Sequence, residues 1–175
     1  MMNDSSNGRR RKIRRSGLGI ACLGLIGVLL AGCMRVQRVD PDLTVDRAKT
    51  DVLAEGKRVV SVIPEKYVEE YRQLDTAYLL ACTSDSYSWP DQGEVTFKGD
   101  PDIRGLMTEI AEHYRNKPGF DVRIEKAWDG DDMVVLKADD GANYYLTVWS
   151  DGVLHVDSFS ACFTLDEDQW PGDAY

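Results

Sequence analysis

The amino-acid sequence predicts an α+β fold: one helix packed on an antiparallel sheet that ends in a four-stranded meander, preceded by an N-terminal helix. Between residues 103 and 114, apolar side chains recur at the helical spacing i, i+3, i+4 and i+7, so this helix needs a surface to cover its apolar side. Three Asp-Gly pairs then recur every 11 residues between segments rich in β-branched and aromatic side chains. Asp-Gly indicates tight hairpin turns, because such turns need positive φ. A helix on one face of an antiparallel sheet is an α+β arrangement.

The first helix of the folded part is expected within residues 43–64. Thr44 can cap it, and Asp46 lies in the first turn, where the helix dipole favours a carboxylate. Its apolar residues lie near helical spacing: Val45, Ala48, Val52, Val59 and Ile63. Gly56 interrupts this pattern, so the sequence predicts a helix of modest stability.

The next segment, residues 65–75, fits a helix by its apolar spacing and a strand by its short length and its tyrosines, and both alternatives stay open. The continuous apolar run over residues 77–82 is typical of a buried strand. A polar loop is expected over residues 83–93. The alternation of Val95 and Phe97 then predicts a strand near residues 94–98.

The clearest helix is predicted to begin after Asp100 as its N-cap, with Pro101 in the first turn, and to end before Pro118. The Asp-Gly pairs are Asp129-Gly130, Asp140-Gly141 and Asp151-Gly152. They separate four predicted antiparallel strands near residues 121–128, 133–138, 143–149 and 153–163. The tail over residues 166–175 is expected to be frayed or loosely docked.

A different pattern occupies the start of the chain. Six basic residues between Arg9 and Arg15 precede an uncharged apolar run from Gly17 to Gly32. As a helix this run would extend about 24 Å, which is less than the hydrocarbon core of about 30 Å, so it is a poor permanent membrane span. Basic, apolar and then small residues in this order are typical of an export signal.

The signal ends in Leu30-Ala31-Gly32-Cys33, which resembles the lipobox of bacterial lipoproteins at all four positions. The resemblance implies that diacylglycerol is transferred to the thiol of Cys33 and that the chain is cleaved between Gly32 and Cys33. It also implies that the mature protein is held by its acyl chains at the outer face of the cell membrane, since two chains bind a bilayer stably. The alternatives are an ordinary secretory signal and a short uncleaved anchor. The resemblance covers 33 residues and says nothing of the remaining 142.

These predictions divide the chain into five parts: a signal peptide (1–32), a tether (33–42), a helical leader (43–64), an α+β domain (65–165) and an acidic C-terminal tail (166–175). The signal peptide holds six of the 21 Lys and Arg residues and one of the 30 Asp and Glu residues, which leaves 15 against 29 and a net charge of −14 on the mature chain. Nucleic acid and anionic lipid headgroups repel such a surface. We therefore expect no nucleic-acid partner.

The cysteines predict one disulfide. Of the four, Cys22 leaves with the signal peptide and Cys33 is the lipidation site, so Cys82 and Cys162 are the one remaining pair. Outside the cell such a pair is expected to be oxidised. In the chain-entropy model, a bridge that closes a loop of roughly 80 residues stabilises the fold by about 4 kcal/mol. The competing interpretation is two separate buried thiols.

No catalytic, cofactor or metal site is predicted. There is no Gly-x-Ser-x-Gly motif, and the two histidines, His113 and His155, are expected to be structural. The acidic turns at residues 129–132 and 139–141 offer oxygen atoms to calcium, but Asp beside Gly is also what hairpin turns use, and calcium is left open. Trp128 and Trp149 lie at or beside Asp-Gly turns and could share one end of the meander.

The sequence therefore favours a lipid-anchored cell-envelope protein with a small extracytoplasmic domain that acts as a non-catalytic binding or scaffolding module. Its expected partners are the membrane, through lipidated Cys33, and another envelope protein or a cell-wall component. The alternative is an envelope hydrolase that uses a pair of acidic residues, as glycosidases do.

Overall fold

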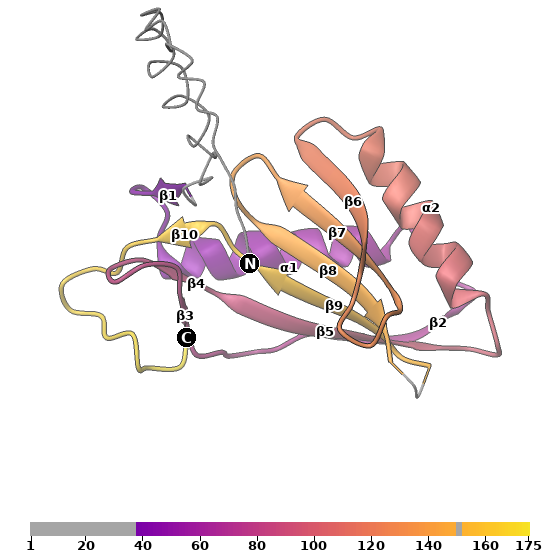
Figure 1. The fold of residues 1–175 in the computed structure, drawn as a ribbon. Coiled ribbons are helices and arrows are strands. Elements are labelled where there is room, and N and C mark those ends of the chain that lie inside the picture. The colour runs from indigo at the N-terminus through magenta and orange to yellow at the C-terminus, as the bar shows by residue number, and fades with distance from the viewer. Residues whose placement is uncertain (1–37, 150–151) are drawn as a thin grey trace, which may run out of the picture. The chain divides into compact units, whose positions relative to one another are not determined.

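The computed structural model describes residues 38–149 and 152–175 of the 175-residue chain. The predicted export signal and Cys33 lie outside these described residues. Within them, two helices and two mostly antiparallel sheets form an α+β fold, as the sequence predicts (Figure 1). Neither described helix is both long enough and apolar enough to cross a membrane.

The elements follow one another in this order: β1 (Val39–Asp40), α1 (Val45–Val60), β2 (Val68–Arg72), β3 (Leu80–Ala81), β4 (Tyr87–Ser88), β5 (Pro90–Phe97), α2 (Ile103–Arg115), β6 (Phe120–Lys126), β7 (Asp132–Ala138), β8 (Asn143–Val148), β9 (Leu154–Phe159) and β10 (Cys162–Phe163). The large sheet has the strand order β2-β5-β9-β8-β7-β6 and is antiparallel throughout. The small sheet has the order β1-β10-β4-β3, in which only β1 and β10 pair in parallel among the described strands.

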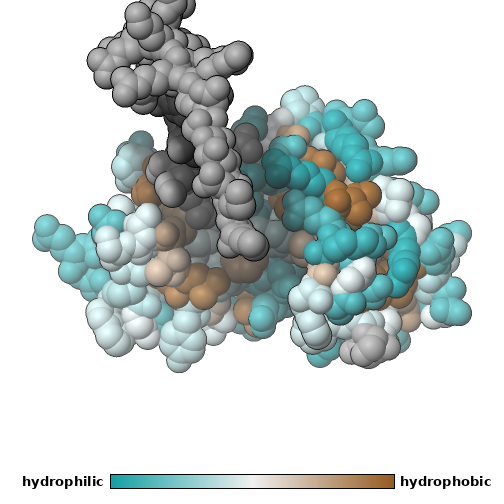
Figure 2. Space-filling model, in the orientation of Figure 1, coloured by the Kyte–Doolittle hydropathy of each residue, from teal (hydrophilic) through white to brown (hydrophobic). Residues whose placement is uncertain are grey.

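Both helices pack on the same face of the large sheet. The register pairs Val134 with Leu146 and Leu146 with Val156, so these buried side chains point to one face. Val52 of α1 and Ile110 of α2 belong to the same buried cluster. α1 contacts β5 and β9, whereas α2 contacts β6, β7 and β8 (Figure 1). Polar side chains cover most of the molecular surface visible in Figure 2, and its apolar areas are separate and smaller.

The four-stranded meander is confirmed, since β6, β7, β8 and β9 are neighbours in chain order and pair antiparallel. The glycines of its three turns have positive φ: +90° at Gly130, +107° at Gly141 and +79° at Gly152. The predicted extent of the last strand, 153–163, is wrong. After Phe159 the chain leaves the large sheet, and Ser160 Oγ accepts a hydrogen bond from the backbone N of Trp89 at 2.9 Å. The chain then enters the small sheet as β10.

The predicted disulfide between Cys82 and Cys162 is present, with 6.3 Å between the two Cα atoms. It connects β10 to the residue that follows β3, so it closes across the small sheet with β4 between the two joined segments. The bridge therefore fixes the strand that continues directly from β9 of the large sheet.

Several predictions for the segment between α1 and α2 need correction. Residues 65–75, left open above, contain strand β2. The run over residues 77–82 is not a buried strand, because only Leu80–Ala81 form a strand, at the edge of the small sheet, and the side chains of Tyr78 and Leu80 are 68% and 47% exposed. Apolar composition alone does not show whether another element covers a run.

The predicted polar loop at residues 83–93 is also partly wrong, because it contains β4 and the beginning of β5. Asp91 lies in β5 and is fully buried. Its carboxylate accepts hydrogen bonds from the backbone N of Leu74 at 2.9 Å and from Gln73 Nε2 at 3.0 Å. These long-range partners allow a polar residue to occupy the inside of the sheet.

The start of α2 also differs from the prediction. The N-cap of α2 is Asp102, whose Oδ1 accepts a hydrogen bond from the backbone N of Gly105 at 3.0 Å, and not Asp100. A cap serves N–H groups two or three residues further on, so it must directly precede a helix that begins at Ile103. Of the two alternatives for the C-terminal tail, frayed or loosely docked, the structure has the docked one, because Tyr175 exchanges two backbone hydrogen bonds with Ala77, at 2.9 and 3.0 Å.

α1 begins where the sequence predicts, since Thr44 Oγ1 accepts a hydrogen bond from the backbone N of Arg47 at 3.4 Å. The helix continues through Gly56, which is a packing site and not an interruption. A Cβ atom there would lie 2.9 Å from the hydroxyl oxygen of Tyr71. Gly93 of β5 faces the same hydroxyl, at 2.8 Å from its ideal Cβ position. The two glycines thus leave the space that the Tyr71 side chain fills between α1 and the sheet.

Gly93→Ala should lower the free energy of unfolding by roughly 1–3 kcal/mol, as overpacking of a closed site does. Its Cβ would also lie 3.0 Å from the backbone oxygen of Val156, which cannot move without the sheet. Gly56→Ala is the matched control and should cost less, because its nearest neighbours are the ends of the Tyr71 and Gln73 side chains and alanine favours the helix. Chemical denaturation measures both variants.

Adding Tyr71→Phe to Gly93→Ala should recover part of the lost stability. The Tyr71 hydroxyl is buried and makes no hydrogen bond of good geometry, so its removal costs little. A Gly93→Ala variant as stable as the wild type would show that the site is not closed.

Candidate functional site

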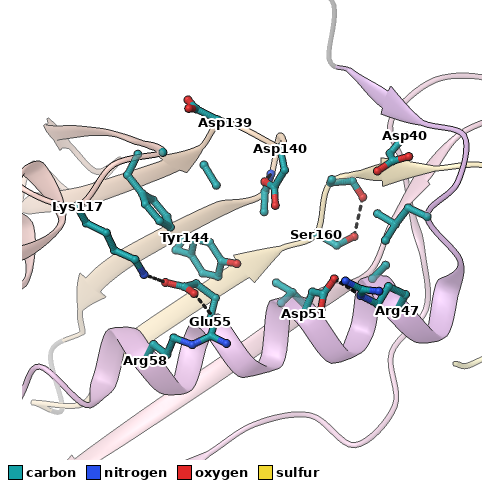
Figure 3. Close-up of a pocket in the computed structure, with 18 of the residues that line it drawn as sticks. Asp40, Arg47, Asp51, Glu55, Arg58, Lys117, Asp139, Asp140, Tyr144 and Ser160 are labelled. Carbon is teal, nitrogen blue, oxygen red and sulfur yellow. Dashed lines mark hydrogen bonds and ion pairs between the residues drawn. The ribbon is translucent and has the colours of Figure 1, made fainter.

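A cavity of about 900 Å³ lies on the helix-covered side of the large sheet (Figure 3). It is bounded by α1, by the turn between β7 and β8, by the segment between α2 and β6, and by the chain just before α1. Its apolar lining includes Leu43, Ala48, Val52, Phe120, Ala142 and Tyr144. Its charged lining consists of six carboxylates and three cations: Asp40, Asp42, Asp51, Glu55, Asp139, Asp140, Arg47, Arg58 and Lys117.

α1 contributes four of these charged residues from one side of the helix. Arg47, Asp51, Glu55 and Arg58 are three or four residues apart, a spacing that places them on one face. Arg47 Nε donates to Asp51 Oδ2 at 2.7 Å, and Arg58 donates to Glu55. The face of α1 toward the cavity is therefore a row of ion pairs (Figure 3).

Glu55 is the most extensively bonded of these residues. Its Oε1 accepts hydrogen bonds from the hydroxyl of Tyr114 at 2.7 Å and from Lys117 Nζ at 2.6 Å, while Arg58 binds Oε2. Burial alone would raise the pKa of Glu55, but the hydrogen bonds from Lys117, Tyr114 and Arg58 together outweigh it and lower the pKa. Glu55 is therefore ionised at neutral pH, and it connects α1 to α2 and to the chain after α2.

Tyr144 of β8 reaches into the cavity from the sheet. Its side chain lies between Glu55 and Asp140 in Figure 3, with the hydroxyl directed into the cavity. The residue is only 3% exposed, and no described residue forms a hydrogen bond with its hydroxyl. Burial first, and then the negative charges of Glu55 and Asp140, raise the pKa of Tyr144 well above its usual range. The cavity thus contains a neutral hydroxyl group that is free to bind a ligand.

Four of the carboxylates that line the cavity have no cationic partners. Asp40 and Asp42 come from the chain before α1, and Asp139 and Asp140 from the turn between β7 and β8. None of the four forms an ion pair with any residue in the described ranges. Asp140 Oδ1 accepts a hydrogen bond from the backbone N of Ala142 at 2.9 Å, which fixes its turn. In Figure 3, Asp140 points into the cavity and Asp139 points away.

The residues predicted from the sequence lie mostly elsewhere. Cys33 is outside the described residues, and its lipidation stays a prediction. The disulfide of Cys82 and Cys162 lies beside the cavity, since the neighbouring Ala161 lines it. His113 is exposed on α2, whereas His155 is buried on the other face of the large sheet.

The acidic turns are occupied by structural contacts. Asp129 Oδ1 accepts a hydrogen bond from the backbone N of Asp131 at 3.0 Å, and Asp131 and Asp132 pair with Arg104 and Lys126 at 2.8 and 2.7 Å. Within residues 38–149 and 152–175, no group of three or more His, Cys, Asp or Glu side chains is arranged to hold a metal ion.

Trp128 and Trp149 lie in the β6–β7 turn and at the end of β8, so they share one end of the meander, and the cavity lies at the other. Their side chains are 99% and 58% exposed. Trp149 stacks on His155 with 4.0 Å between the ring centroids. The aromatic pair is thus separate from the cavity.

Two carboxyl groups with raised pKa values do not form an acid pair. Burial is the main cause of the raised pKa at both Asp91 and Asp157. Asp91 is opposite Ser158 in the register, so Asp91 and Asp157 point to opposite faces of the sheet. Neither residue lines the cavity. Catalysis by two converging carboxyl groups would require both on one side.

No protein-family model matches this chain, and neither does any curated protein or solved structure.

Glu55→Gln should lower the free energy of unfolding at pH 7 by about 2 kcal/mol, because it leaves two cations without their partly buried carboxylate. The lowered pKa means that the native state favours the ionised form of Glu55. Its stabilisation is present above the ordinary pKa of 4.5 and is lost as pH falls through the lower native value. Chemical denaturation at pH 7 and pH 3 should therefore show a difference between wild type and variant that shrinks at pH 3.

Asp51→Asn is the control for this experiment. It removes a carboxylate from the same face of α1, but the Arg47–Asp51 pair is exposed, with side chains 69% and 55% accessible. Such pairs contribute less than about 1 kcal/mol. Equal losses for the two variants would contradict the role given to Glu55.

Proposed function

We propose that this chain is a lipid-anchored protein of the cell envelope whose α+β domain is a non-catalytic binding module, with its ligand in the cavity beside α1. The observation that carries the proposal is the cavity itself. Its volume of about 900 Å³ falls within the range of small-molecule sites, and it combines apolar walls with a few polar groups, as such sites do.

The location outside the cytoplasm is supported by two independent features of the chain. The lipobox resemblance of Leu30 to Cys33 supports export and lipidation. The Cys82–Cys162 disulfide supports an oxidising compartment, because such bridges are rare in the cytosol. The membrane would thus be one partner, through Cys33, and an envelope component would be the other.

The tether would keep the cavity close to the bilayer. Val39, the start of β1, is six positions after Cys33, which is a reach of about 20 Å when fully extended. Asp40 of β1 already lines the cavity. A ligand at the outer surface of the membrane is therefore within reach of the site.

Replacing Cys33 with Ala should release the protein from the membrane fraction and abolish incorporation of labelled palmitate, because the thiol that receives the lipid is absent. Fractionation and metabolic labelling measure both effects. Cys22→Ala is the matched control and should leave lipidation unchanged. A Cys33→Ala protein that stays in the membrane, uncleaved, would show that the segment is an ordinary anchor.

The binding role is tested separately by filling the cavity. Ala142 is buried and lines the cavity, so Ala142→Phe should displace a bound ligand. Native mass spectrometry of protein purified from its own membranes should show added mass on the wild type that the variant lacks. Thermal unfolding checks that the variant is folded. An equal mass on both proteins, or none on the wild type, would contradict a ligand in this cavity.

A further inference from the structure

We propose that the cavity binds an organic cation, an ammonium or guanidinium group on an apolar body, and that the hydroxyl of Tyr144 and the carboxylate of Asp140 receive the charged group. The inference rests on the binding function proposed above and specifies the chemistry of its ligand. It follows from the charge balance of the cavity lining, from the free hydroxyl, and from the apolar surface beside both.

The charge balance of the lining is negative after all internal pairs are formed. Each of the three cations has a carboxylate partner, since Arg47 pairs with Asp51, and both Arg58 and Lys117 pair with Glu55, which offsets one of their two charges. Four exposed aspartates of the lining have no such partner among the described residues, and of these Asp140 points into the cavity while Asp139 points away: Asp40, Asp42, Asp139 and Asp140. They belong to two separate segments that meet at the cavity, so a cation between them would offset their mutual repulsion.

The hydroxyl of Tyr144 is an independent indication of a ligand. The hydroxyl is not among the fully buried polar atoms that lack a partner, so it is open to the cavity and its partner there is solvent or a ligand. Tyr144 is 3% exposed, its hydroxyl points into the cavity, and no described residue binds it. Glu55 and Asp140 both act on it with negative charge. A phenol oxygen in a negative field is a suitable acceptor for the N–H of a cation.

Apolar surface next to Tyr144 would accommodate the apolar body of the ligand. Leu43, Val52, Phe120 and Ala142 line the same cavity, so a ligand with an apolar body would bury it there. The protein itself places a cation in a similar setting. Lys117 Nζ lies 4.9 Å from the ring centroid of Phe120 and 4.7 Å from that of Tyr114 while it binds Glu55.

An anionic ligand fits this lining less well. It could share Arg58 or Lys117, because Glu55 offsets only one of their two charges, but it would also approach the four unpaired aspartates, and six carboxylates against three cations give the lining a net charge of −3. Its carboxylate or phosphate would also lie beside Glu55 and Asp140. Like charges at close range oppose binding.

The test compares three probes with the same apolar body: 2-phenylethylamine, 2-phenylethanol and 3-phenylpropionate, which are cationic, neutral and anionic at pH 7. Ligand-observed NMR titration with the full-length protein in neutral detergent measures their dissociation constants. The amine should bind at least roughly tenfold more tightly than the other two, as one charge-assisted hydrogen bond allows. The amide of N-acetyl-Phe-Arg, whose only cation is the arginine guanidinium, then distinguishes a peptide side chain from a free amine as the source of the cation.

Two variants and one matched control assign the site. Tyr144→Phe and Asp140→Asn should each weaken binding of the amine by roughly fivefold or more. Asp129→Asn removes one charge from an equivalent Asp-Gly turn at the other end of the meander, where Asp129 also accepts a backbone hydrogen bond. It should change the dissociation constant by less than about twofold, because a distant exposed charge is screened.

Three results would overturn the inference: no binding of the amine, tighter binding of the propionate or the alcohol, or equal weakening by Asp129→Asn and Asp140→Asn. If the propionate or the alcohol binds more tightly and Tyr144→Phe still weakens that binding, the cavity is a binding site but its ligand is not a cation. Loss of the binding function itself is detected separately, by the Ala142→Phe experiment.

Discussion

The carboxylate of Glu55 is the contact on which the arrangement of the two helices depends. It receives hydrogen bonds from Tyr114 at the end of α2, from Lys117 after it and from Arg58 on its own helix. A charge at a mostly buried position is tolerated only when such partners compensate its desolvation. Because they come from different elements, the same contacts set the separation of α1 from the segment before β6. That separation determines the width of the cavity.

The parts of the fold that could be predicted from the sequence depend on neighbouring residues. The apolar stripe of α2 and the Asp-Gly turns are patterns formed by residues close together in the sequence. The helix and the meander that they predict are both present. The parts that could not be predicted depend on distant contacts. Gly56 is a glycine because Tyr71 packs against it, and Asp91 is buried because Gln73 and Leu74 bind it. No local pattern carries that information.

The candidate site shows the same limit. Arg47, Asp51, Glu55 and Arg58 form a charged stripe, and a charged stripe on a helix ordinarily faces water. Only the neighbouring turn and the chain after α2 make it the wall of a cavity. Along β8, buried positions alternate with less buried ones, and Tyr144 occupies a buried position. Its place in the sequence therefore predicts a packing role. Its free hydroxyl becomes visible only when its surroundings are known. The disulfide, in contrast, followed from a count of cysteines once Cys22 and Cys33 were assigned.

The parallel pairing of β1 with β10 has a mechanical consequence. With Cys33 held in a bilayer, as proposed, a pull on the domain would load the two-residue strand β1 before any other element. Two pairs, Val39 with Cys162 and Asp40 with Phe163, would carry that load, and the disulfide would pass it on to Cys82. α1, which follows β1 in the chain and carries core residues such as Val45, would take the load only after β1 had detached. Detachment of β1 would remove Asp40 from the cavity wall, so tension on the tether would alter the site without unfolding the domain.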